Sequence, residues 1–259
     1  MNFRELHYAD RPLLLPNAWD VASGAALAEA GFAAVGTTSL GVAAAAGEDD
    51  AAGATREQTV GLARRLAALP VPVTVDIEAG FSDRPDDVAA LVAELASFGV
   101  AGINIEDGRR NEAPAPVKAQ AELIEAIKAA APDVFVNART DCYWLADRDG
   151  PRLQETLTRL HAYAGAGADG VFVPGIAADA DISAVVAEIP LPLNVLHLPG
   201  RTAPARLADL GVRRISCGSL LYRTALHAAV STALELAGRP DDRPVPSYAD
   251  VVRLTPPTA

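Results

Sequence analysis

Short apolar runs alternate with longer amphipathic stretches along this chain of 259 residues. Eight of the runs have the length and composition of β-strands and lie at Leu13–Leu15, Ala33–Thr37, Val73–Asp76, Gly102–Ile105, Val134–Arg139, Gly170–Val173, Leu193–Val195 and Arg214–Cys217. The amphipathic stretches predict helices at Val21–Ala30, Arg56–Ala68, Pro85–Phe98, Val117–Ala131, Leu153–Ala166, Ile182–Glu188, Ala205–Leu210 and Leu220–Ala237. Such alternation is typical of parallel βαβ units.

The helix ends carry local signals that support these boundaries. Thr55 and Gln58 have the spacing of a capping box at the start of the second helix. Four helices are followed by a glycine where a left-handed cap is expected, at Gly31, Gly99, Gly167 and Gly211. Eight repeating units without a dinucleotide-binding fingerprint favour an α/β fold of the (β/α)8 TIM-barrel type over a doubly wound sheet. The length fits one barrel domain spanning residues 1–259, with a C-terminal helix and tail at about 219–259.

Composition narrows the class of protein. The net charge of -11 would repel a phosphate backbone, so nucleic acid is not an expected partner. The first twelve residues lack the pattern of a secretory signal, and the uncharged segment 30–47 is too weakly apolar for a membrane span. Cys142 and Cys217 are expected to be reduced thiols. These features predict a cytoplasmic protein with no membrane partner.

Carboxylates follow two neighbouring predicted strands, at the edge where barrel enzymes form their active sites. Asp76 and Glu78 stand two residues apart at one strand end, where the pleat would point both to the same side, and Glu106 ends the next strand. A hard cation is the simplest way to keep three converging carboxylates ionised, and Mg2+ suits oxygen ligands, with Mn2+ as the alternative. The competing interpretation is that these acids cap the following helices or are solvated.

Other polar side chains after the predicted strands suit a carboxylate or phosphonate substrate. Arg139 offers a planar charged fork and Asn194 a neutral amide, although Arg139 would serve equally in a structural ion pair with Asp141 or Glu106. Small residues with hydroxyls and backbone N–H groups form the loop Thr37, Thr38 and Ser39. Asn17 and Trp19 follow the first strand and complete the candidate substrate-binding set. His197 lies in a loop beside Pro199 and is expected to be incidental.

Five phrases in order resemble the isocitrate lyase and phosphoenolpyruvate mutase superfamily, from Leu13 to about Ala237. They are LLLPNAWDVASGAALAEAGFAAVGTTSLGVA, VTVDIEAGF, GINIEDG, VNARTD and LADLGVRRISCG. The resemblance implies a (β/α)8 barrel that binds Mg2+ and a pyruvate-like enolate. It also implies a homotetramer in which the last helix is exchanged between neighbouring barrels. The Ala- and Leu-rich segment Ser219–Ala237 agrees with that exchange, although packing on its own barrel is the simpler alternative.

The resemblance also implies roles for individual residues. Asp76 resembles the direct metal ligand, while Asp50, Glu78 and Glu106 resemble acids that reach the metal through water. Arg139 resembles the arginine that binds the substrate carboxylate and the enolate oxygen, and Asn194 an asparagine that contacts a distal acid group. The loop Thr37, Thr38 and Ser39 aligns with a loop that binds carboxylate or phosphonate oxygens, where other members carry a Ser-Gly pair. Arg139, Asp50 and Glu106 are thus the candidate catalytic residues.

One departure from the family pattern affects the expected reaction. The lyases and mutases carry a mobile loop with a cysteine or lysine signature after the fourth strand, whereas this chain has GRRNEAP from Gly108 to Pro114. The general acid of the lyases is therefore absent from its usual place. The sequence predicts a Mg2+-dependent enzyme that cleaves a C–C bond of a small 2-oxo or 2-hydroxy acid, as a lyase or as a decarboxylase of an oxaloacetate-like substrate. P–C bond chemistry and a catalytically reduced keto-acid-binding protein are the alternatives.

Overall fold

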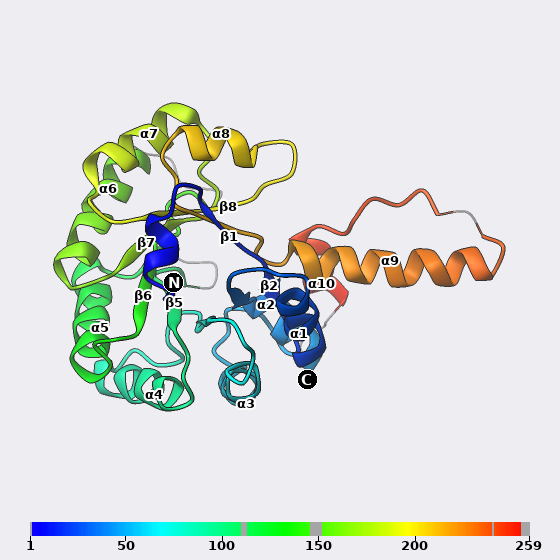
Figure 1. Cartoon of the computed structure of the whole chain (residues 1–259), viewed down its shortest axis with the longest axis horizontal. Helices are drawn as coiled ribbons and strands as arrows, with labels where there is room; N and C mark the ends of the chain where they lie inside the picture. Colours follow the sequence, from blue (N-terminus) through cyan, green and yellow to red (C-terminus); the bar gives the residue numbers. More distant parts are fainter. Residues whose placement is uncertain (1, 110–112, 146–151, 240, 255–259) are drawn as a thin grey trace.

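The computed structural model describes residues 2–109, 113–145, 152–239 and 241–254. Nine strands form one sheet in the order β1-β9-β8-β7-β6-β5-β4-β3-β2, and every neighbouring pair is parallel. The strands are β1 (Leu13–Leu15), β2 (Asn17–Ala18), β3 (Val35–Thr37), β4 (Val73–Asp76), β5 (Gly102–Glu106), β6 (Phe135–Arg139), β7 (Gly170–Val173), β8 (Leu193–Leu196) and β9 (Arg214–Ser216). Helices surround this sheet, which curls into a nearly closed barrel (Figure 1). The predicted (β/α)8-type fold is confirmed.

The first predicted strand is present as β1, and the additional strand is β2, which the sequence did not predict and which Pro16 separates from β1. Proline has no N–H group to donate, so the hydrogen-bonded ladder breaks there. β1 pairs with β9 on one side of the break, and β2 pairs with β3 on the other. The Asn17 side chain spans the junction: its Nδ2 donates to the carbonyl of Thr37 at 2.8 Å, and its Oδ1 accepts from the N–H groups of Cys217 and Gly218, each at 2.9 Å. Asn17 therefore ties the two edges of the sheet together.

All eight predicted helices are present, and the structure adds two more. The helices are α1 (Val21–Glu29), α2 (Ser39–Ala46), α3 (Arg56–Leu66), α4 (Pro85–Ser97), α5 (Val117–Ala130), α6 (Arg152–Gly165), α7 (Asp179–Glu188), α8 (Pro204–Asp209), α9 (Leu220–Leu236) and α10 (Tyr248–Leu254), preceded by a 3-10 turn at Glu5–Tyr8. The sequence did not predict α2, α10 or the 3-10 turn. Buried residues dominate the first half of α2, which removes the amphipathic pattern by which helices are recognised.

The glycine signals are confirmed and the capping box is not. Gly31, Gly99, Gly167 and Gly211 adopt φ values of 88°, 92°, 96° and 88°, which is the left-handed region that favours glycine. The Thr55 side chain does not cap α3. Its hydroxyl instead donates to Glu78 Oε1 at 2.7 Å, and its backbone, with φ of -99° and ψ of 15°, is outside the extended region usual for an N-cap.

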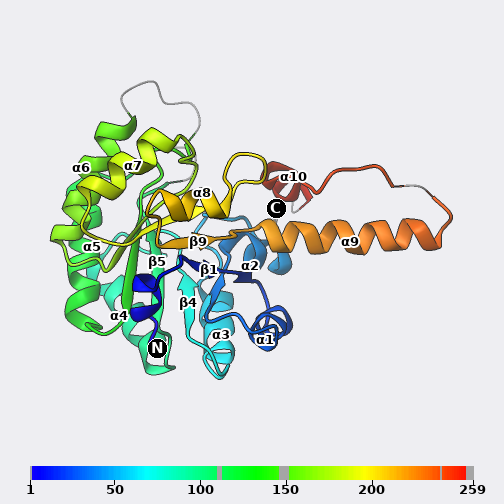
Figure 2. The same cartoon turned by 45° about the horizontal axis from the view of Figure 1, so that its top comes forward.

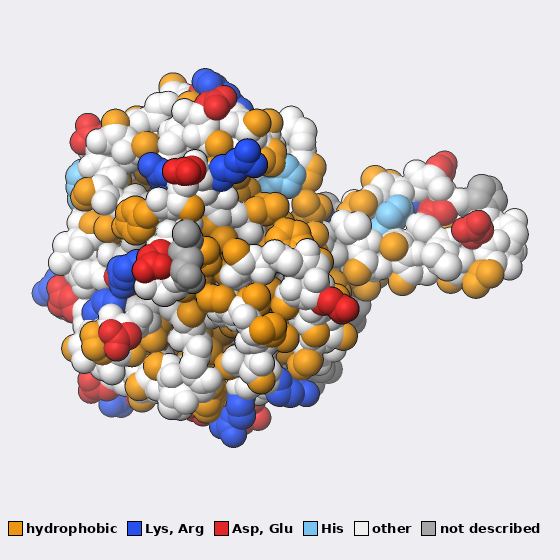
Figure 3. Space-filling view, in the orientation of Figure 1, with side chains coloured by type: hydrophobic (Ala, Val, Ile, Leu, Met, Phe, Trp, Pro, Cys, Tyr) orange, Lys and Arg blue, Asp and Glu red, His pale blue; other side chains and the backbone are white. Residues whose placement is uncertain are grey.

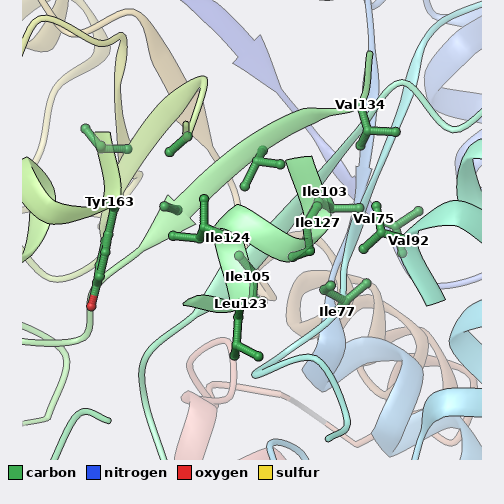
Figure 4. Close-up of a cluster of buried hydrophobic side chains, with 14 of the residues drawn as sticks. Val75, Ile77, Val92, Ile103, Ile105, Leu123, Ile124, Ile127, Val134 and Tyr163 are labelled. Carbon is green, nitrogen blue, oxygen red and sulfur yellow. The ribbon is translucent and has the colours of Figure 1, made fainter. Parts of the chain in front are cut away.

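Apolar side chains on the outer faces of the strands form the main core against the helices. Val75, Ile103 and Ile105 are fully buried, and they belong to one cluster with Ile124 and Ile127 of α5 (Figure 4). Burying a side chain of this size stabilises the fold by about 1.5–3 kcal/mol. Alternate strand positions point to the other face, so the interior of the barrel is available for polar residues.

The barrel interior is correspondingly polar. Asn104 Oδ1 accepts hydrogen bonds from Asn137 Nδ2 at 2.9 Å and from Arg214 Nη2 at 3.1 Å, joining β5, β6 and β9 across the barrel. The N-terminal end is filled by aromatic rings: His7 stacks on Phe135 with ring centroids 4.2 Å apart, and Phe3 meets Phe135 edge-on at 5.5 Å. The floor of the barrel is thus sealed, which leaves its opposite end for a site.

Helix α9 departs from the regular barrel because it projects away from the body of the molecule (Figures 1 and 2). Tyr222 is the buried residue of this helix, whereas Val230 and Leu236 are 43% and 85% exposed. Hydrophobic side chains are visible along the projecting arm in Figure 3. Leu14 of β1 is also 43% exposed, so the outer face of this strand is incompletely covered. The alternative that α9 packs along its own barrel is therefore not what the structure shows.

No helix in the described parts of the chain combines the length and apolar character that crossing a membrane requires.

The buried imidazole of His7 predicts a pH-dependent contribution to stability. Burial and the positive charge of Arg214 lower the pKa of His7 to about 3, whereas an unfolded histidine titrates near about 6.5. Between these values the unfolded chain binds more protons, so the free energy of unfolding falls as the pH falls. We expect the variant His7→Phe, which keeps a ring against Phe135, to reduce the pH slope of that free energy by about 1 kcal/mol per pH unit between about pH 4 and 6. Urea unfolding at several pH values measures it, and parallel pH profiles for the two proteins would contradict it.

Candidate active site

A cavity of about 370 Å³ lies at the carboxyl ends of the strands. Asp76, Glu106 and Arg139, the last residues of β4, β5 and β6, line it. Further lining residues come from the segments around these strand ends and include Thr38, Ser39, Asp50, Asn104, Asp141, Trp144 and Tyr248. This position, at the C-terminal face of a parallel barrel, is where TIM-barrel enzymes hold their active sites.

Arg139 is the central cation of the cavity. Its Nε and Nη2 donate to the two oxygens of Asp141 at 2.6 and 3.0 Å, and its Nη1 contacts Glu106 Oε2 at 2.7 Å. Burial alone would lower the pKa of Arg139, but the charges of Asp141 and Glu106 raise it well above the ordinary value. The structural ion pairs of Arg139 with Asp141 and with Glu106, which the sequence suggested as an alternative to substrate binding, are both present. They also fix the guanidinium in the lining of the cavity.

Asp107 anchors Asp141, the residue that pairs with Arg139. It is fully buried, and its Oδ1 accepts the backbone N–H of Asp141 at 2.9 Å. Its Oδ2 accepts from the Tyr163 hydroxyl at 2.6 Å and pairs with Arg159 at 3.1 Å. Tyr163 and Arg159 are one turn apart on α6, so one helix face carries both. Asp107 therefore links α6 to the loop that positions Arg139.

The half-buried Asp76 and the buried Glu106 have perturbed pKa values. Burial raises the pKa of Asp76, as does the nearby Asp50, while the positive charge of Arg139 opposes the rise. Burial raises the pKa of Glu106 well above the ordinary value, and the charges of Asp141, Asp76 and Asp50 act in the same direction against that of Arg139. Among the described residues, five acids line the cavity, Asp49, Asp50, Asp76, Glu106 and Asp141, against the two arginines Arg109 and Arg139. This excess of acids is the charge pattern expected of a cation site.

Glu78 lies next to this group but not on the strand. β4 ends at Asp76 and Glu78 has a φ of 51°, so the alternation of a strand does not orient its side chain. Its carboxylate instead accepts from the Thr55 hydroxyl at 2.7 Å and from the Gly53 N–H at 3.1 Å. Burial raises the pKa of Glu78 to about 7, with Asp50 and Asp76 contributing, against the lowering effect of those two hydrogen bonds. Glu78 is outside the set of described residues that line the cavity.

Asp50 has one oxygen in use and one without a partner. Its Oδ2 accepts a hydrogen bond from the Tyr248 hydroxyl at 2.6 Å. Its Oδ1 is buried, and no described residue donates a hydrogen bond to it. A buried carboxylate oxygen without a donor is costly, and a hydrated cation is one group that satisfies it.

The loop Thr37, Thr38 and Ser39 becomes the start of helix α2. Thr37 uses its hydroxyl to accept the N–H of Asp76 at 2.8 Å, which sets the end of β4 beside it. Thr38 is the N-cap of α2 without a side-chain capping bond, and both Thr38 and Ser39 line the cavity. The N–H groups and the positive dipole of a helix N-terminus favour an anion there, and the Ser39 N–H already lowers the pKa of the neighbouring Asp76, against the effect of burial.

The remaining predicted residues lie at the margin of the cavity or outside it. Asn17 lines the cavity, but its side chain is occupied by the bonds that close the barrel. Asn194 is fully buried below it and accepts from the Ser216 hydroxyl at 3.2 Å. Trp19 packs edge-on against Tyr222 with ring centroids 5.5 Å apart. Trp19, Asn194 and His197 are not among the described residues that line the cavity.

The described residues fit a magnesium ion that keeps much of its water. No group of three His, Cys, Asp or Glu side chains in the described parts of the chain forms a ready-made metal site. Mg2+ commonly binds through one or two carboxylates and retains several water molecules, so three direct ligands are not required. Asp76 and the unpartnered Oδ1 of Asp50 supply such oxygens in the cavity.

Sequence reasoning missed several residues of the cavity. Asn104 alternates with the predicted outward-facing apolar residues of β5, so its inward position was readable from the strand pattern. Trp144 and Tyr248 come from segments outside the predicted strands and helices, and no local signal marks them. Within the loop where a lyase-type acid was sought, Gly108 and Arg109 line the cavity, while residues 110–112 lie outside the described residues.

Comparison with known proteins places these observations in a family. The model of the phosphoenolpyruvate phosphomutase family matches residues 3–237. An uncharacterised protein of Mycobacterium tuberculosis is 46% identical over 253 residues, covering 97% of this chain and 95% of that protein. A solved phosphoenolpyruvate phosphomutase from Streptomyces platensis is 26% identical with a TM-score of 0.79, covering 91% of this chain and 87% of that one.

Two further relatives catalyse different reactions. The 2-methylisocitrate lyase of Bacillus subtilis is 32% identical over 200 residues, covering 74% of this chain and 64% of the lyase. An oxaloacetate decarboxylase of a Bradyrhizobium strain is 32% identical over 175 residues, covering 64% of this chain and 57% of the decarboxylase. This chain therefore spans less than two thirds of both enzymes.

The chain belongs to the phosphoenolpyruvate phosphomutase family, and the resemblance to the superfamily of that mutase and isocitrate lyase is confirmed. It is an enzyme of this superfamily of carbon–carbon lyases and mutases, and not a true isocitrate lyase.

The role of Asp107 as an anchor predicts a large loss of stability when its charge is removed. We expect Asp107→Asn to lower the free energy of unfolding by about 3 kcal/mol, at the low end of the range for a broken buried pair, because Arg159 then keeps only the partly exposed Glu155 as a counterion. Adding Arg159→Met should restore part of that loss, since the incompletely paired charge is then gone. The exposed pair of Lys118 and Glu122 provides the control, and Glu122→Gln should cost less than about 1 kcal/mol. Urea unfolding measures all four proteins, and equal losses for Asp107→Asn and Glu122→Gln would refute the anchor.

Proposed function

We propose that this protein is a Mg2+-dependent enzyme that cleaves a C–C bond of a small 2-oxo or 2-hydroxy acid through an enolate, with an oxaloacetate-like substrate. The observation that carries the proposal is the placement of buried Arg139 beside Asp76, Glu106 and Asp50 in one cavity at the strand ends. A fixed cation next to an excess of carboxylates suits a reaction in which negative charge develops on a substrate oxygen.

Asp76 would hold the metal directly, and Asp50, Glu78 and Glu106 would reach it through water. Bound there, Mg2+ would act as a Lewis acid on the oxygens of a 2-oxo acid. Glu78 fits this role as an outer acid, because it lies behind Asp76 and is itself held by Thr55 and Gly53. Mn2+, which prefers similar oxygen ligands, is the alternative ion.

The protein's own residues would bind and orient the substrate. Arg139 is already charged and fixed by Asp141, so it would stabilise an enolate oxygen without reorganising during the reaction. Thr38 and Ser39, at the N-terminus of α2, would bind the substrate carboxylate. Asn17, Trp19 and Asn194 would support these contacts from the positions described above rather than by direct contact at the cavity centre.

Decarboxylation fits the available acids better than cleavage of an isocitrate. Isocitrate-type cleavage needs a proton delivered to the departing carbon, and a positioned general acid typically contributes about 10²- to 10⁴-fold. Cys142 does not supply it, because it is 2% exposed and burial raises the pKa of its thiol. In decarboxylation CO2 departs without a proton, and water can protonate the enolate afterwards. The resemblance to the oxaloacetate decarboxylase supports this choice.

P–C bond chemistry is the second candidate, favoured by the family model and by the likeness to the Streptomyces mutase. It would use the same cation and the α2 N-terminus to bind a phosphonate. A phosphoryl-handling lysine is not present among the described residues that line the cavity, and an activated group of this kind is what the reaction requires. A keto-acid-binding protein without turnover is the remaining alternative.

A substrate panel tests the proposed function. With Mg2+ present, we expect release of pyruvate and CO2 from oxaloacetate after subtraction of metal-only decarboxylation, and no useful turnover of isocitrate or 2-methylisocitrate. Asp76→Ala should abolish both the metal dependence and the activity. Turnover of either isocitrate at about 1 to 10³ per second would show that another group replaces the lyase acid. Rearrangement of phosphoenolpyruvate without oxaloacetate turnover would favour the mutase, and binding alone the third alternative.

We further propose that the protein is a homotetramer in which α9 is exchanged between neighbouring barrels. The projecting helix exposes Val230 and Leu236, and Leu14 on the barrel is also exposed. Hydrophobic side chains gathered along an arm that stands away from the barrel support a contact with a neighbouring protein (Figure 3).

Light scattering tests this assembly. We expect the mass of a tetramer at micromolar concentration, and we expect Val230→Glu to shift the protein toward smaller species because it places a charge in the buried contact. A monomeric wild-type protein would rule out the assembly.

A further inference from the structure

The C-terminal helix α10 forms one wall of the cavity. Tyr248 and Val252, one turn apart on this helix, line the cavity, while Val251 on the neighbouring face is 1% exposed and packs with Leu40 and Tyr222. The match to the family model ends at residue 237, so α10 lies beyond the part of the chain that the family pattern covers. The wall is therefore a feature of this chain that the family match does not describe.

Tyr248 makes two contacts with the candidate site. Its hydroxyl donates to Asp50 Oδ2 at 2.6 Å, which is a short hydrogen bond of the kind made to ionised acceptors. Its ring meets Trp144 edge-on, with centroids 5.8 Å apart and an interplanar angle of 85°. The guanidinium carbon of Arg139 lies 6.0 Å from the centre of the Trp144 ring. Tyr248 thus touches one acid of the cavity and the aromatic neighbour of its cation.

Asp50 needs an external partner because its own segment provides little support. It lies between α2 and α3, outside any helix or strand, and the following residue Ala51 adopts a left-handed φ of 57°. The Oδ1 atom is buried and has no donor among the described residues, so the bond to Oδ2 restrains the carboxylate. Without that bond the side chain would be free to rotate away from the cavity.

The start of α10 is itself held firmly. The Ser247 N–H donates to Asp250 Oδ2 at 2.8 Å, and the Asp250 N–H donates back to Ser247 Oγ at 3.2 Å, in the manner of a capping box. Arg223 of α9 donates to the carbonyl of Pro246 at 2.7 Å. These contacts fix the backbone next to Tyr248, so its hydroxyl has a defined position from which to restrain another group.

We propose that Tyr248 is a positioning residue that holds Asp50 with its free oxygen available to a hydrated divalent cation in the cavity. This inference rests on the proposed function, because it assigns Asp50 to the cation. It extends the active site to the C-terminal helix and makes Tyr248 necessary for full cation affinity.

Cation binding by the whole protein tests the inference without depending on turnover. We expect Tyr248→Phe, which keeps the ring against Trp144, to weaken Mg2+ binding about 10-fold, at the low end of the effect typical for residues that orient metal ligands. The matched control is Tyr222→Phe, which removes a hydroxyl from the same hydrophobic cluster at a residue that does not line the cavity, and its affinity should equal that of the wild type. Calorimetric titration with Mg2+ gives the affinities, and thermal unfolding shows that each variant is folded.

A double-variant cycle distinguishes positioning of Asp50 from a general structural role. If Tyr248 acts through Asp50, then Tyr248→Phe should change Mg2+ affinity less than about 2-fold in a protein that already carries Asp50→Asn. Equal 10-fold effects in both backgrounds would overturn the inference, as would unchanged affinity in Tyr248→Phe while the wild type binds Mg2+. A wild-type protein that binds no Mg2+ would overturn the proposed function and the inference with it.

Discussion

The buried ion-pair group around Arg139 is the interaction on which the rest of the site depends. A guanidinium taken out of water is costly unless charged and hydrogen-bonded partners surround it, and here Glu106 and Asp141 supply them from two different segments. Breaking either pair would leave the Arg139 guanidinium with only one of these two carboxylate partners. The barrel therefore has to hold β5, β6 and the loop after β6 in one relative position. Asp107 holds the loop after β6 in place, because it bonds to the backbone N–H of Asp141 and to Arg159 of α6.

The same arrangement explains why the cavity is suited to a cation. Arg139 balances part of the charge of Glu106, Asp141, Asp76 and Asp50, and burial raises the pKa values of Asp76 and Glu106 in spite of it. A divalent ion would relieve this excess, and the substrate would bring its own negative charge to Arg139 and the N-terminus of α2. The polar interior beneath, where Asn104 joins Asn137 and Arg214, gives the site a floor that is hydrogen-bonded rather than apolar.

Most of the fold could be predicted from the sequence because strand and helix periodicity are local. The predicted strands and helices are present, and the glycine turns between them have the expected left-handed backbone. The features that the sequence did not predict correctly depend on tertiary contacts. The Thr55 hydroxyl bonds to the buried carboxylate of Glu78 and does not cap α3. Helix α2 lacks an amphipathic pattern because buried residues dominate its first half. Pro16 was visible in the sequence, yet its effect on closure depends on pairing with strands far along the chain.

Strand ends made one part of the site predictable, whereas Thr38, Ser39 and Asp50 line the cavity from positions beyond a strand, and Asp50 was expected from the family resemblance alone. Asp76, Glu106 and Arg139 line the cavity because each ends a strand, and Glu78 does not because the strand stops two residues earlier. Tyr248 lies 198 residues from Asp50, so no spacing rule connects them.

The path of the chain to Tyr248 connects the site to the projecting helix. After α9 the chain runs back along it, with Asp241 bonded to Ser231 and Pro246 bonded to Arg223, before α10 reaches the cavity. The direction of α9 therefore fixes where α10 can lie. An assembly that immobilises α9 would also steady Tyr248 and, through it, Asp50. Helix α9 exposes Val230 and Leu236 in the single chain, and in the proposed assembly it would both bury this apolar surface and support the cavity wall that α10 forms.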